Sequence, residues 1–410
     1  MARLARPRLS AWRFVVTFGV VSLLSDFVYE GARSITGPLL AHLGASALVV
    51  GVVTGIGEAA ALVLRLASGP LADRSKRFWS WVIAGYALTV VSVPTLGLAG
   101  TLWVACALVI AERVGKAVRS PAKDALLSYA TAATGRGRGF AVQEALDQIG
   151  AIVGPLVVAL MLIVTGGNYT PSLAVLALPG IAALALLFWL RARVPNPLQF
   201  EAAHAESTAP EPRDRAAAPA PRGGGAIRRL PWAFWAYSGF TAMTMTGFAT
   251  FGVLSFHMVQ RGILSATAVP VLYAAVMAID AVVALGAGWA YDRFGPRTLI
   301  LLPMIAAAIP VFAFTDVLAS VIAGALLWGA ALGIQESTLR ATVADMVPTD
   351  RRSTAYGIYA AVVGVATAIG GVLAGALYGV SIPALIIVTM AIQAVAVATF
   401  ITVFVRRRRH

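Results

Sequence analysis

The chain alternates long apolar runs with short polar segments over almost its entire length. Each run has about 20 residues or more, which is enough for an α-helix to cross the hydrocarbon core of a bilayer. Helices are expected because a single apolar run in lipid must satisfy its own backbone hydrogen bonds. The pattern predicts an all-α membrane protein with twelve transmembrane helices, at residues 14–40, 45–72, 78–98, 101–122, 139–165, 172–192, 231–258, 266–291, 298–315, 317–346, 353–379 and 382–405.

The composition supports lipid as the solvent. The 410 residues are 59% hydrophobic and only 12% charged, whereas a soluble domain is about half apolar and roughly a quarter charged. A water-soluble globule cannot bury so much apolar surface, so the lipid bilayer is the expected partner.

The net charge is +14, which on a soluble domain would suggest nucleic acid as a partner. Here the basic residues gather in every second connection between the apolar runs, so nucleic-acid binding is not expected. Cytoplasmic loops are enriched in Lys and Arg, and the alternation predicts that both termini are cytoplasmic. The basic segment 1–13 is interpreted as a cytoplasmic tail because no small-residue cleavage site follows it.

The segment 194–229 departs from the apolar pattern. It is rich in Pro, Ala, Gly and charged residues, a composition that cannot bury a core, so a flexible cytoplasmic linker is predicted. The linker divides the chain into an N-terminal six-helix bundle, residues 1–193, and a C-terminal six-helix bundle, residues 230–410.

The two halves carry similar short motifs in one register. GPLADR at 69–74 matches GWAYDR at 288–293, and RSPAK at 119–123 matches ESTLR at 336–340. Two similar halves around a linker are typical of transporters whose pathway lies between the repeats.

Both copies of the first motif resemble the signature loop of the major facilitator superfamily, which lies between helices two and three and recurs between helices eight and nine. The first copy, GPLADRSKR, departs from the pattern at Ser75, and the second, GWAYDRFGPR, departs at Pro296. The segment AERVGKAVRSPAKDA at 111–125 looks like a bacterial branch of this superfamily that is rich in presumed exporters. The resemblance implies two pseudo-symmetric six-helix bundles, alternating access and a place in the bacterial cytoplasmic (inner) membrane. We expect the protein to function as a monomer.

The signature loops predict a conformational latch. Asp73 lies just past a helix end, where a carboxylate can cap a neighbouring helix, and Arg74 and Arg77 can pair with carboxylates such as Glu144. The alternative is that the basic residues only hold the loop in the cytoplasm. The predicted latch residues are Gly69, Asp73, Arg74, Arg77, Glu144, Asp147, Gly288, Asp292 and Arg293.

Ionisable residues inside the apolar runs are the main functional candidates, because each costs about 2.5–3.5 kcal/mol at the centre of a spanning helix. Asp26, Glu30 and Arg33 lie on one face of the first span, and Glu58 lies at mid-depth in the second. Asp26 and Glu30 are the first choice for a proton or cation site, and Glu58 is the second. The alternative for Glu30 and Arg33 is a static salt bridge that fixes helix packing.

The fourth span carries a charged stripe. Glu112, Lys116, Arg119 and Lys123 follow one helical face, with Arg113 beside them, so this face must meet a cavity or partner helices. Arg113 resembles the fourth-helix arginine that the superfamily often uses to sense the first-helix acid. Three cations on one face would also suit an anionic cargo. The alternative is that Lys116, Arg119 and Lys123 extend to the cytoplasmic interface.

The second half has fewer buried charges. Asp280 is isolated near the middle of the eighth span and Glu336 lies in the tenth, and both join the candidates for proton coupling or substrate binding. In the fifth span, Glu144 and Asp147 are expected to pair with bases of the fourth. The aromatic and Met side chains of this half suit an adaptable apolar surface.

Several kinds of chemistry are absent from the sequence. It contains no GxxxxGK(S/T), HExxH, CxxC or GxSxG motif and has one cysteine, so an enzyme, an ATP-driven pump and a metal site are not expected. A proton gradient is the expected energy source, and no cofactor is predicted. The leading hypothesis is an antiporter for proton-coupled export of a small organic solute or drug. The alternatives are a carrier of an anion or metal ion and, less favoured, a membrane-embedded receptor or enzyme.

Overall fold

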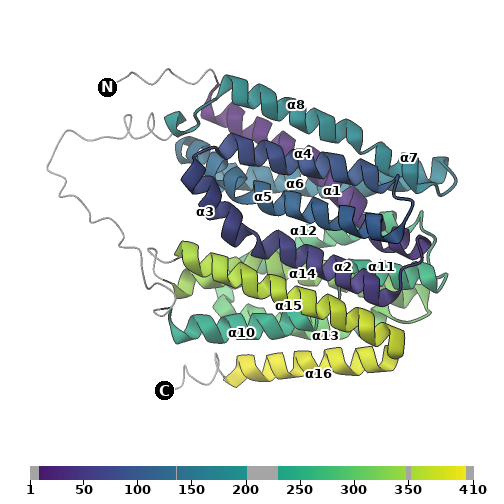
Figure 1. The fold of residues 1–410 in the computed structure, drawn as a ribbon. Helices are drawn as coiled ribbons and strands as arrows, with labels where there is room; N and C mark the ends of the chain where they lie inside the picture. The colour runs from purple at the N-terminus through teal and green to yellow at the C-terminus, as the bar shows by residue number, and fades with distance from the viewer. Residues whose placement is uncertain (1–8, 135, 201–229, 348–351, 403–410) are drawn as a thin grey trace.

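The computed structural model describes residues 9–134, 136–200, 230–347 and 352–402, and these form long helices packed side by side (Figure 1). No strand occurs within these residues. Ten helical stretches among them are long and apolar enough to cross a membrane. The protein is therefore an all-α, multi-pass membrane protein, as the apolar pattern predicts.

The N-terminal half contains eight described helices, because two predicted spans are each divided into two helices. They are α1 (Ala11–His42), α2 (Ala47–Val63), α3 (Arg65–Ser75), α4 (Phe78–Leu96), α5 (Leu102–Thr134), α6 (Arg136–Val164), α7 (Tyr169–Ala174) and α8 (Ala177–Arg193). The predicted span 45–72 is divided at Leu64, where α2 ends and α3 begins. The predicted span 172–192 is divided between α7 and α8.

The C-terminal half also consists of helices, and one of its predicted spans is interrupted. Its elements are α10 (Trp232–Thr246), α11 (Phe251–Gln260), α12 (Val269–Phe294), the 3₁₀-helix η2 (Gly295–Ile300), α13 (Leu301–Ala313), α14 (Leu318–Met346), α15 (Arg352–Val380) and α16 (Ile382–Phe400). The predicted span 231–258 is interrupted between α10 and α11. Most of the predicted linker, residues 201–229, lies outside the described residues.

Two features explain why ten apolar stretches correspond to twelve predicted spans. The stretch Val269–Ala313 covers the eighth and ninth spans, because η2 joins α12 to α13 without a break. Helix α5 is not one of the ten because its charged residues make it less apolar than the other spans. Charge on a membrane-spanning helix is tolerated only where it faces protein or a water-filled cavity.

The start of α1, the end of α8, the start of α10 and the end of α16 lie at the same end of the bundle (Figure 1). We call this the linker end, because α8 ends and α10 begins there, and the opposite end is the far end. It is the end that the distribution of Arg and Lys predicts to be cytoplasmic.

The two halves pack closely where α2 meets α15 and where α1 meets α11. A Cβ atom on Gly51 would overlap the carbonyl oxygen of Gly371, and one on Gly37 would overlap the hydroxyl of Ser255. These positions need glycine because only a missing side chain lets the backbones approach so closely. The hydroxyls of Thr54 and Thr250 add a hydrogen bond of 2.7 Å between the halves.

Candidate functional site

Polar side chains from three helices meet inside the N-terminal half. Spacings of three and four residues place the contributing side chains on one face of α1 and one face of α5. We call this group the central cluster; it consists of Tyr29, Glu30 and Arg33 on α1, Glu58 on α2, and Glu112, Arg113 and Lys116 on α5.

Ion pairs join the central cluster into one chain. Arg33 lies 2.9 Å from Glu58 and 3.6 Å from Glu30. Arg113 lies 3.3 Å from Glu58 and 3.2 Å from Glu112. The carboxylate of Glu58 is therefore shared by two arginines from different helices. Because a buried charge is strongly destabilising without its partner, these residues stabilise each other as a group.

Tyr29 lies at the centre of this chain, although its residue type and position did not predict a role for it. Its hydroxyl oxygen accepts hydrogen bonds from Arg33 at 3.0 Å, Arg113 at 2.7 Å and Lys116 at 3.0 Å. The Lys116 ammonium also lies 4.1 Å from the centre of the Tyr29 ring, within cation–π distance. A phenol oxygen has two lone pairs, so three cationic donors compete for them.

The C-terminal half completes the cluster with aromatic side chains. Tyr273 on α12 donates a hydrogen bond to Glu30 across the interface between the halves. The guanidinium of Arg33 lies 5.7 Å from the ring centre of Trp328 on α14. The ring of Phe248 stacks on that of Trp328 with 5.8 Å between ring centres, and the ring centres of Phe251 and Tyr273 are 4.5 Å apart. The sequence identifies these aromatics only as part of a broad apolar surface, since their partners lie on helices far away in the chain.

A second polar cluster lies closer to the linker end. Lys123 on α5 is 3.5 Å from Asp147 on α6 and donates a hydrogen bond of 3.1 Å to Ser22 on α1. Asp26 interacts electrostatically with both Lys123 and Asp147. The predicted pairing of Asp147 with a base of the fourth span is confirmed. Lys123 points into the bundle and not towards the cytoplasmic membrane interface. Asp26 belongs to this second cluster, and it also interacts electrostatically with Lys116 of the central cluster.

Arg119 is also buried, with an exposed fraction of 4%. It donates to the hydroxyl of Thr89 at 2.7 Å and lies 4.7 Å from the centre of the Tyr86 ring. Within the described residues, neither Arg119 nor Lys116 has a carboxylate within 4.0 Å. Arg119 binds Thr89 and Lys116 binds Tyr29 inside the bundle. The alternative in which these two side chains extend to the cytoplasmic membrane interface is therefore wrong.

Asp280 on α12 is buried but not isolated, which corrects the prediction. Its carboxylate accepts a hydrogen bond of 3.3 Å from the side-chain amide of Gln148 on α6, across the interface between the halves. It also interacts electrostatically with Glu336, whose side chain is exposed. Asp280 and Glu336 form no part of the ion-pair chain described above.

The signature loops do not make the predicted close contacts. A Cβ atom on Gly69 would meet Pro121 at an ordinary 3.8 Å, and one on Gly288 would meet nothing within 4 Å. Asp73 does not cap α4, which begins after Arg77 without a side-chain hydrogen bond at its cap, and residues 348–351 before α15 lie outside the described residues. The predicted close approach at Gly69 and Gly288 is wrong for this conformation, and the capping role of Asp73 stays a prediction for helices other than α4.

The ion pairs predicted for Arg74 and Arg77 are not formed among the described residues. In the described part of the chain, Arg74 and Arg77 have no ion pair with Glu144. Asp292 and Arg293 are exposed, and the Arg293 guanidinium lies 5.8 Å from the centre of the Trp289 ring. Exposed charges near a helix end can be satisfied by water and need no protein partner.

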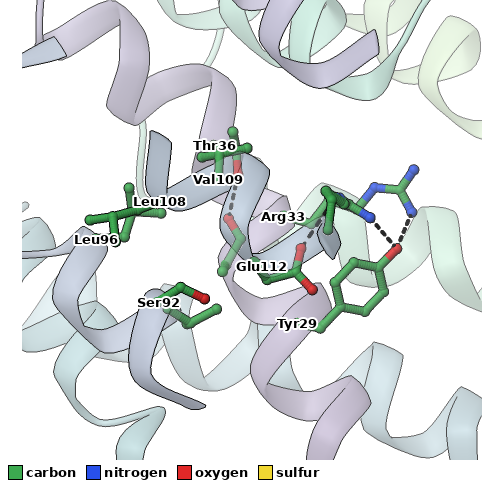
Figure 2. A pocket seen from close by; sticks show the side chains of 11 residues that line it. Tyr29, Arg33, Thr36, Ser92, Leu96, Leu108, Val109 and Glu112 are labelled. Carbon is green, nitrogen blue, oxygen red and sulfur yellow. Dashed lines mark hydrogen bonds and ion pairs between the residues drawn. The ribbon is translucent and has the colours of Figure 1, made fainter. Parts of the chain in front are cut away.

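A small cavity lies beside the central cluster, between α1, α4 and α5. Figure 2 shows Tyr29 and Arg33 on one side of it, Leu96 and Leu108 on the opposite side, and Glu112 between them. The cavity offers about 20 Å³ to the centre of a water molecule, which is enough for one water. Its other lining residues are Ala32, Thr36, Ser92, Val93, Val109 and Arg113.

Comparison with known proteins places this architecture in a family. The family model of the Major Facilitator Superfamily matches residues 18–285 and 263–410. An uncharacterized protein of Mycobacterium tuberculosis is 63% identical over 391 residues, covering 95% of this chain and 93% of that protein. An uncharacterized MFS-type transporter of Methanocaldococcus jannaschii is 24% identical over 369 residues, covering 90% of this chain and 89% of its own.

Solved structures agree on the fold. The crystal structure of the nucleoside transporter NupG aligns with a TM-score of 0.70 at 12% identity, covering 95% of this chain and 99% of that chain. At such low identity the likeness concerns the fold alone. The family model and the relatives cover nearly the whole chain, and the chain belongs to the Major Facilitator Superfamily of transporters.

Proposed function

We propose that this transporter moves a small organic solute across the bacterial cytoplasmic membrane by proton-coupled alternating access, and that it acts as an antiporter in the direction of export. One observation carries the proposal. The buried ion-pair chain of α1, α2 and α5 ends on Glu30, which bonds to Tyr273 of the other half.

A charged group between two halves that move against each other suits both binding and gating. Arg33 has a carboxylate on each side, at Glu30 and Glu58, and the Trp328 ring nearby. A solute with polar groups on an apolar or aromatic body can exchange hydrogen bonds with the ion pairs and stack on the aromatics. Displacing the bond between Glu30 and Tyr273 would loosen one contact between the halves.

Protons are the proposed energy source because the cluster holds three carboxylates close to arginines, at Glu30, Glu58 and Glu112. Protonation of a carboxylate removes its pairing with arginine, so the ion pairs must redistribute. The direction of export rests on the resemblance of residues 111–125 to an exporter-rich branch. The cytoplasmic location of the termini rests on the distribution of Arg and Lys, and we propose that the monomer is the working unit.

A second candidate function is transport of an anion. It is favoured by Lys116 and Arg119, which face protein without a carboxylate within 4.0 Å in the described residues. Two such cations on one face of α5 could bind an anionic group of a substrate.

Flux measurements in proteoliposomes test both functions. The probes are a radiolabelled nucleoside, a dipeptide, a fluorescent organic cation and an aromatic carboxylate, each assayed with and without an imposed pH gradient. The proposal expects at least one organic probe to move against its concentration gradient when a pH gradient is imposed, and an uncoupler to abolish this movement. Movement of the carboxylate alone, unaffected by the uncoupler, would favour the anion carrier. Flux that never depends on pH would contradict proton coupling.

A further inference from the structure

Glu112 has a buried carboxylate oxygen that nothing in the described protein satisfies. The residue has an exposed fraction of 6%. One oxygen, Oε2, pairs with Arg113 at 3.2 Å, whereas the other, Oε1, is buried and has no hydrogen-bond partner among the described residues. Buried polar atoms are nearly always paired, because leaving one unpaired costs about 1–3 kcal/mol or more for a charged group.

The lining of the small cavity explains why no protein group fills this role. Ser92 donates its hydroxyl proton to the carbonyl of Leu88 on its own helix, and Thr36 donates to that of Ala32. Both hydroxyls therefore donate their hydrogen bonds to backbone carbonyls, and only their acceptor lone pairs are available to the cavity. The third hydroxyl of the lining, that of Tyr29, is bonded to Arg33, Arg113 and Lys116 and makes no hydrogen bond to Oε1 of Glu112. A donor to this oxygen must therefore come with a water molecule or as a proton on the carboxylate itself.

The position of the cavity indicates from which side a proton would come. Leu96 is the last residue of α4, at the far end, and Leu108 lies in the second turn of α5, which begins at the far end. The cavity thus lies between the central cluster and the far end of the bundle. A proton that enters from the far end meets Glu112 before it meets Glu58.

The charged groups around Glu112 come from three helices. Helix α1 contributes Glu30 and Arg33, α2 contributes Glu58, and α5 itself contributes Arg113 and Lys116. Helix α4 carries no charged residue between Phe78 and Leu96. Asp147 of α6 pairs with Lys123 of α5, and Asp26 of α1 interacts electrostatically with both, closer to the linker end. Arg65 of α3 interacts electrostatically with Glu58.

We propose that Glu112 is the proton-binding residue of this transporter, loaded through water in the cavity, and that the ion-pair chain reports its charge to the interface between the halves. In the loading step, a hydronium ion transfers its proton to Oε1 of Glu112, a new O–H bond forms, and neutral water is left. Arg113 then keeps only Glu58 as a carboxylate partner. The inference rests on the proposed proton coupling and assigns its site.

The consequence passes along the chain by competition for shared oxygens. Arg113 and Arg33 both bind Oε1 of Glu58, at 3.3 Å and 2.9 Å. When Arg113 draws closer to Glu58, Arg33 turns towards Glu30, which then binds the hydroxyl of Tyr273 less strongly. A proton on Glu112 therefore weakens the contact between the halves without touching it.

Infrared difference spectroscopy of the full chain in liposomes tests the assignment without any solute. Acidification of the wild type is expected to produce a protonated-carboxyl band from a buried group, and Glu112→Gln is expected to remove it. Asp124→Asn, on the exposed face of the same helix, is the matched control and is expected to retain the band. If Glu112→Gln retains the band as well, the assignment is overturned.

A second variant guards against a fold defect in Glu112→Gln. Ser92→Leu fills the cavity and leaves the carboxyl in place, so the band is expected to be weaker or to rise more slowly after a pH jump. A band unchanged in size and rate contradicts loading through the cavity. Flux measurements distinguish this inference from the proposed function. If pH-driven flux survives in Glu112→Gln, only the inference is overturned. If Glu112→Gln loses the band but wild-type flux does not depend on pH, only the proposed proton coupling is overturned.

Discussion

The hydroxyl of Tyr273 donates a hydrogen bond to Glu30, and the two residues belong to opposite halves of the chain. Glu30 is held by Arg33 on the next turn of its own helix. The contact between the halves is thus tied directly to the ion pairs of the N-terminal half. This link lets a charge change in one half alter the position of the other.

Tyr273→Phe removes this hydrogen bond and keeps the ring. A hydrogen bond to a charged group contributes about 1.5–3 kcal/mol, which corresponds to roughly 10- to 100-fold in an equilibrium constant. We expect flux of a transported probe, measured in proteoliposomes, to fall by about this factor. Tyr169→Phe, on the short helix α7 away from the site, is the control and should leave flux unchanged; equal losses in both variants would argue against a specific role.

Glu58→Gln leaves Arg33 and Arg113 sharing one neutral amide. Removing one partner of a buried ion pair typically costs about 3–5 kcal/mol, so the variant should unfold at a lower temperature or denaturant concentration. A double-mutant cycle with Arg113→Gln should give a coupling energy of about 0.5–3 kcal/mol. Additive effects of the two substitutions would show that the pair does not exist in the membrane.

Cysteines at positions 54 and 250 should lock the two halves together. The hydroxyls of Thr54 and Thr250 are 2.7 Å apart, and a disulfide needs Cβ atoms only about 3.5–4.5 Å apart. With the buried Cys106 replaced by Ser, oxidation of Thr54→Cys/Thr250→Cys is expected to stop flux and reductant to restore it. The single variants serve as controls, and a cross-linked protein that still transports would refute movement at this seam.

The loop pair Arg261 and Asp316 at the far end predicts a pH effect on stability. Two hydrogen bonds of 2.9 Å from Arg261 hold the pKa of the Asp316 carboxyl below its usual range. A depressed folded pKa adds stability above the ordinary value of about 3.9, and this stability is lost as the pH falls through the folded pKa.

Asp316→Asn should therefore lower the melting temperature slightly near neutral pH, and make a smaller difference at about pH 3, because this stability declines from the ordinary pKa towards the folded pKa. The effect should be small and weakened by added salt, because both side chains are exposed. Thermal melts at the two pH values, each at low and high salt, measure it. A destabilisation that is the same at both pH values would mean that the charge of Asp316 does not matter.

The sequence predicts the helices and the charged faces well, because both signals are periodic within one segment. Glu30, Arg33, Glu58, Glu112 and Arg113 all carry a cost in lipid that marks them as buried against protein. A role for Tyr29 was not predicted, because a neutral tyrosine carries no such cost in lipid. Its three cationic partners become visible only when α1 and α5 are side by side.

Contacts between distant helices are the part that periodicity cannot supply. A helical face shows that Asp280 points inwards, but not that Gln148 on α6 meets it. The predicted latch shows the same limit: Asp73 and Arg74 lie at an exposed helix end, where water satisfies a charge as well as a partner does, so the latch stays a prediction. Local patterns show which groups need a partner, and the packing decides which partner they find.

The charge on α5 also bears on how the protein is made. Glu112, Arg113, Lys116 and Arg119 each carry a penalty of about 2.5–3.5 kcal/mol for a helix that enters the bilayer alone. Their partners on α1, α2 and α4 precede α5 in the chain, so we expect these helices to lower the cost of inserting α5. The residues of the candidate site are therefore also expected to assist assembly of the N-terminal half, and part of the effect of a change at Tyr29 or Glu58 is expected as a lower yield of inserted protein.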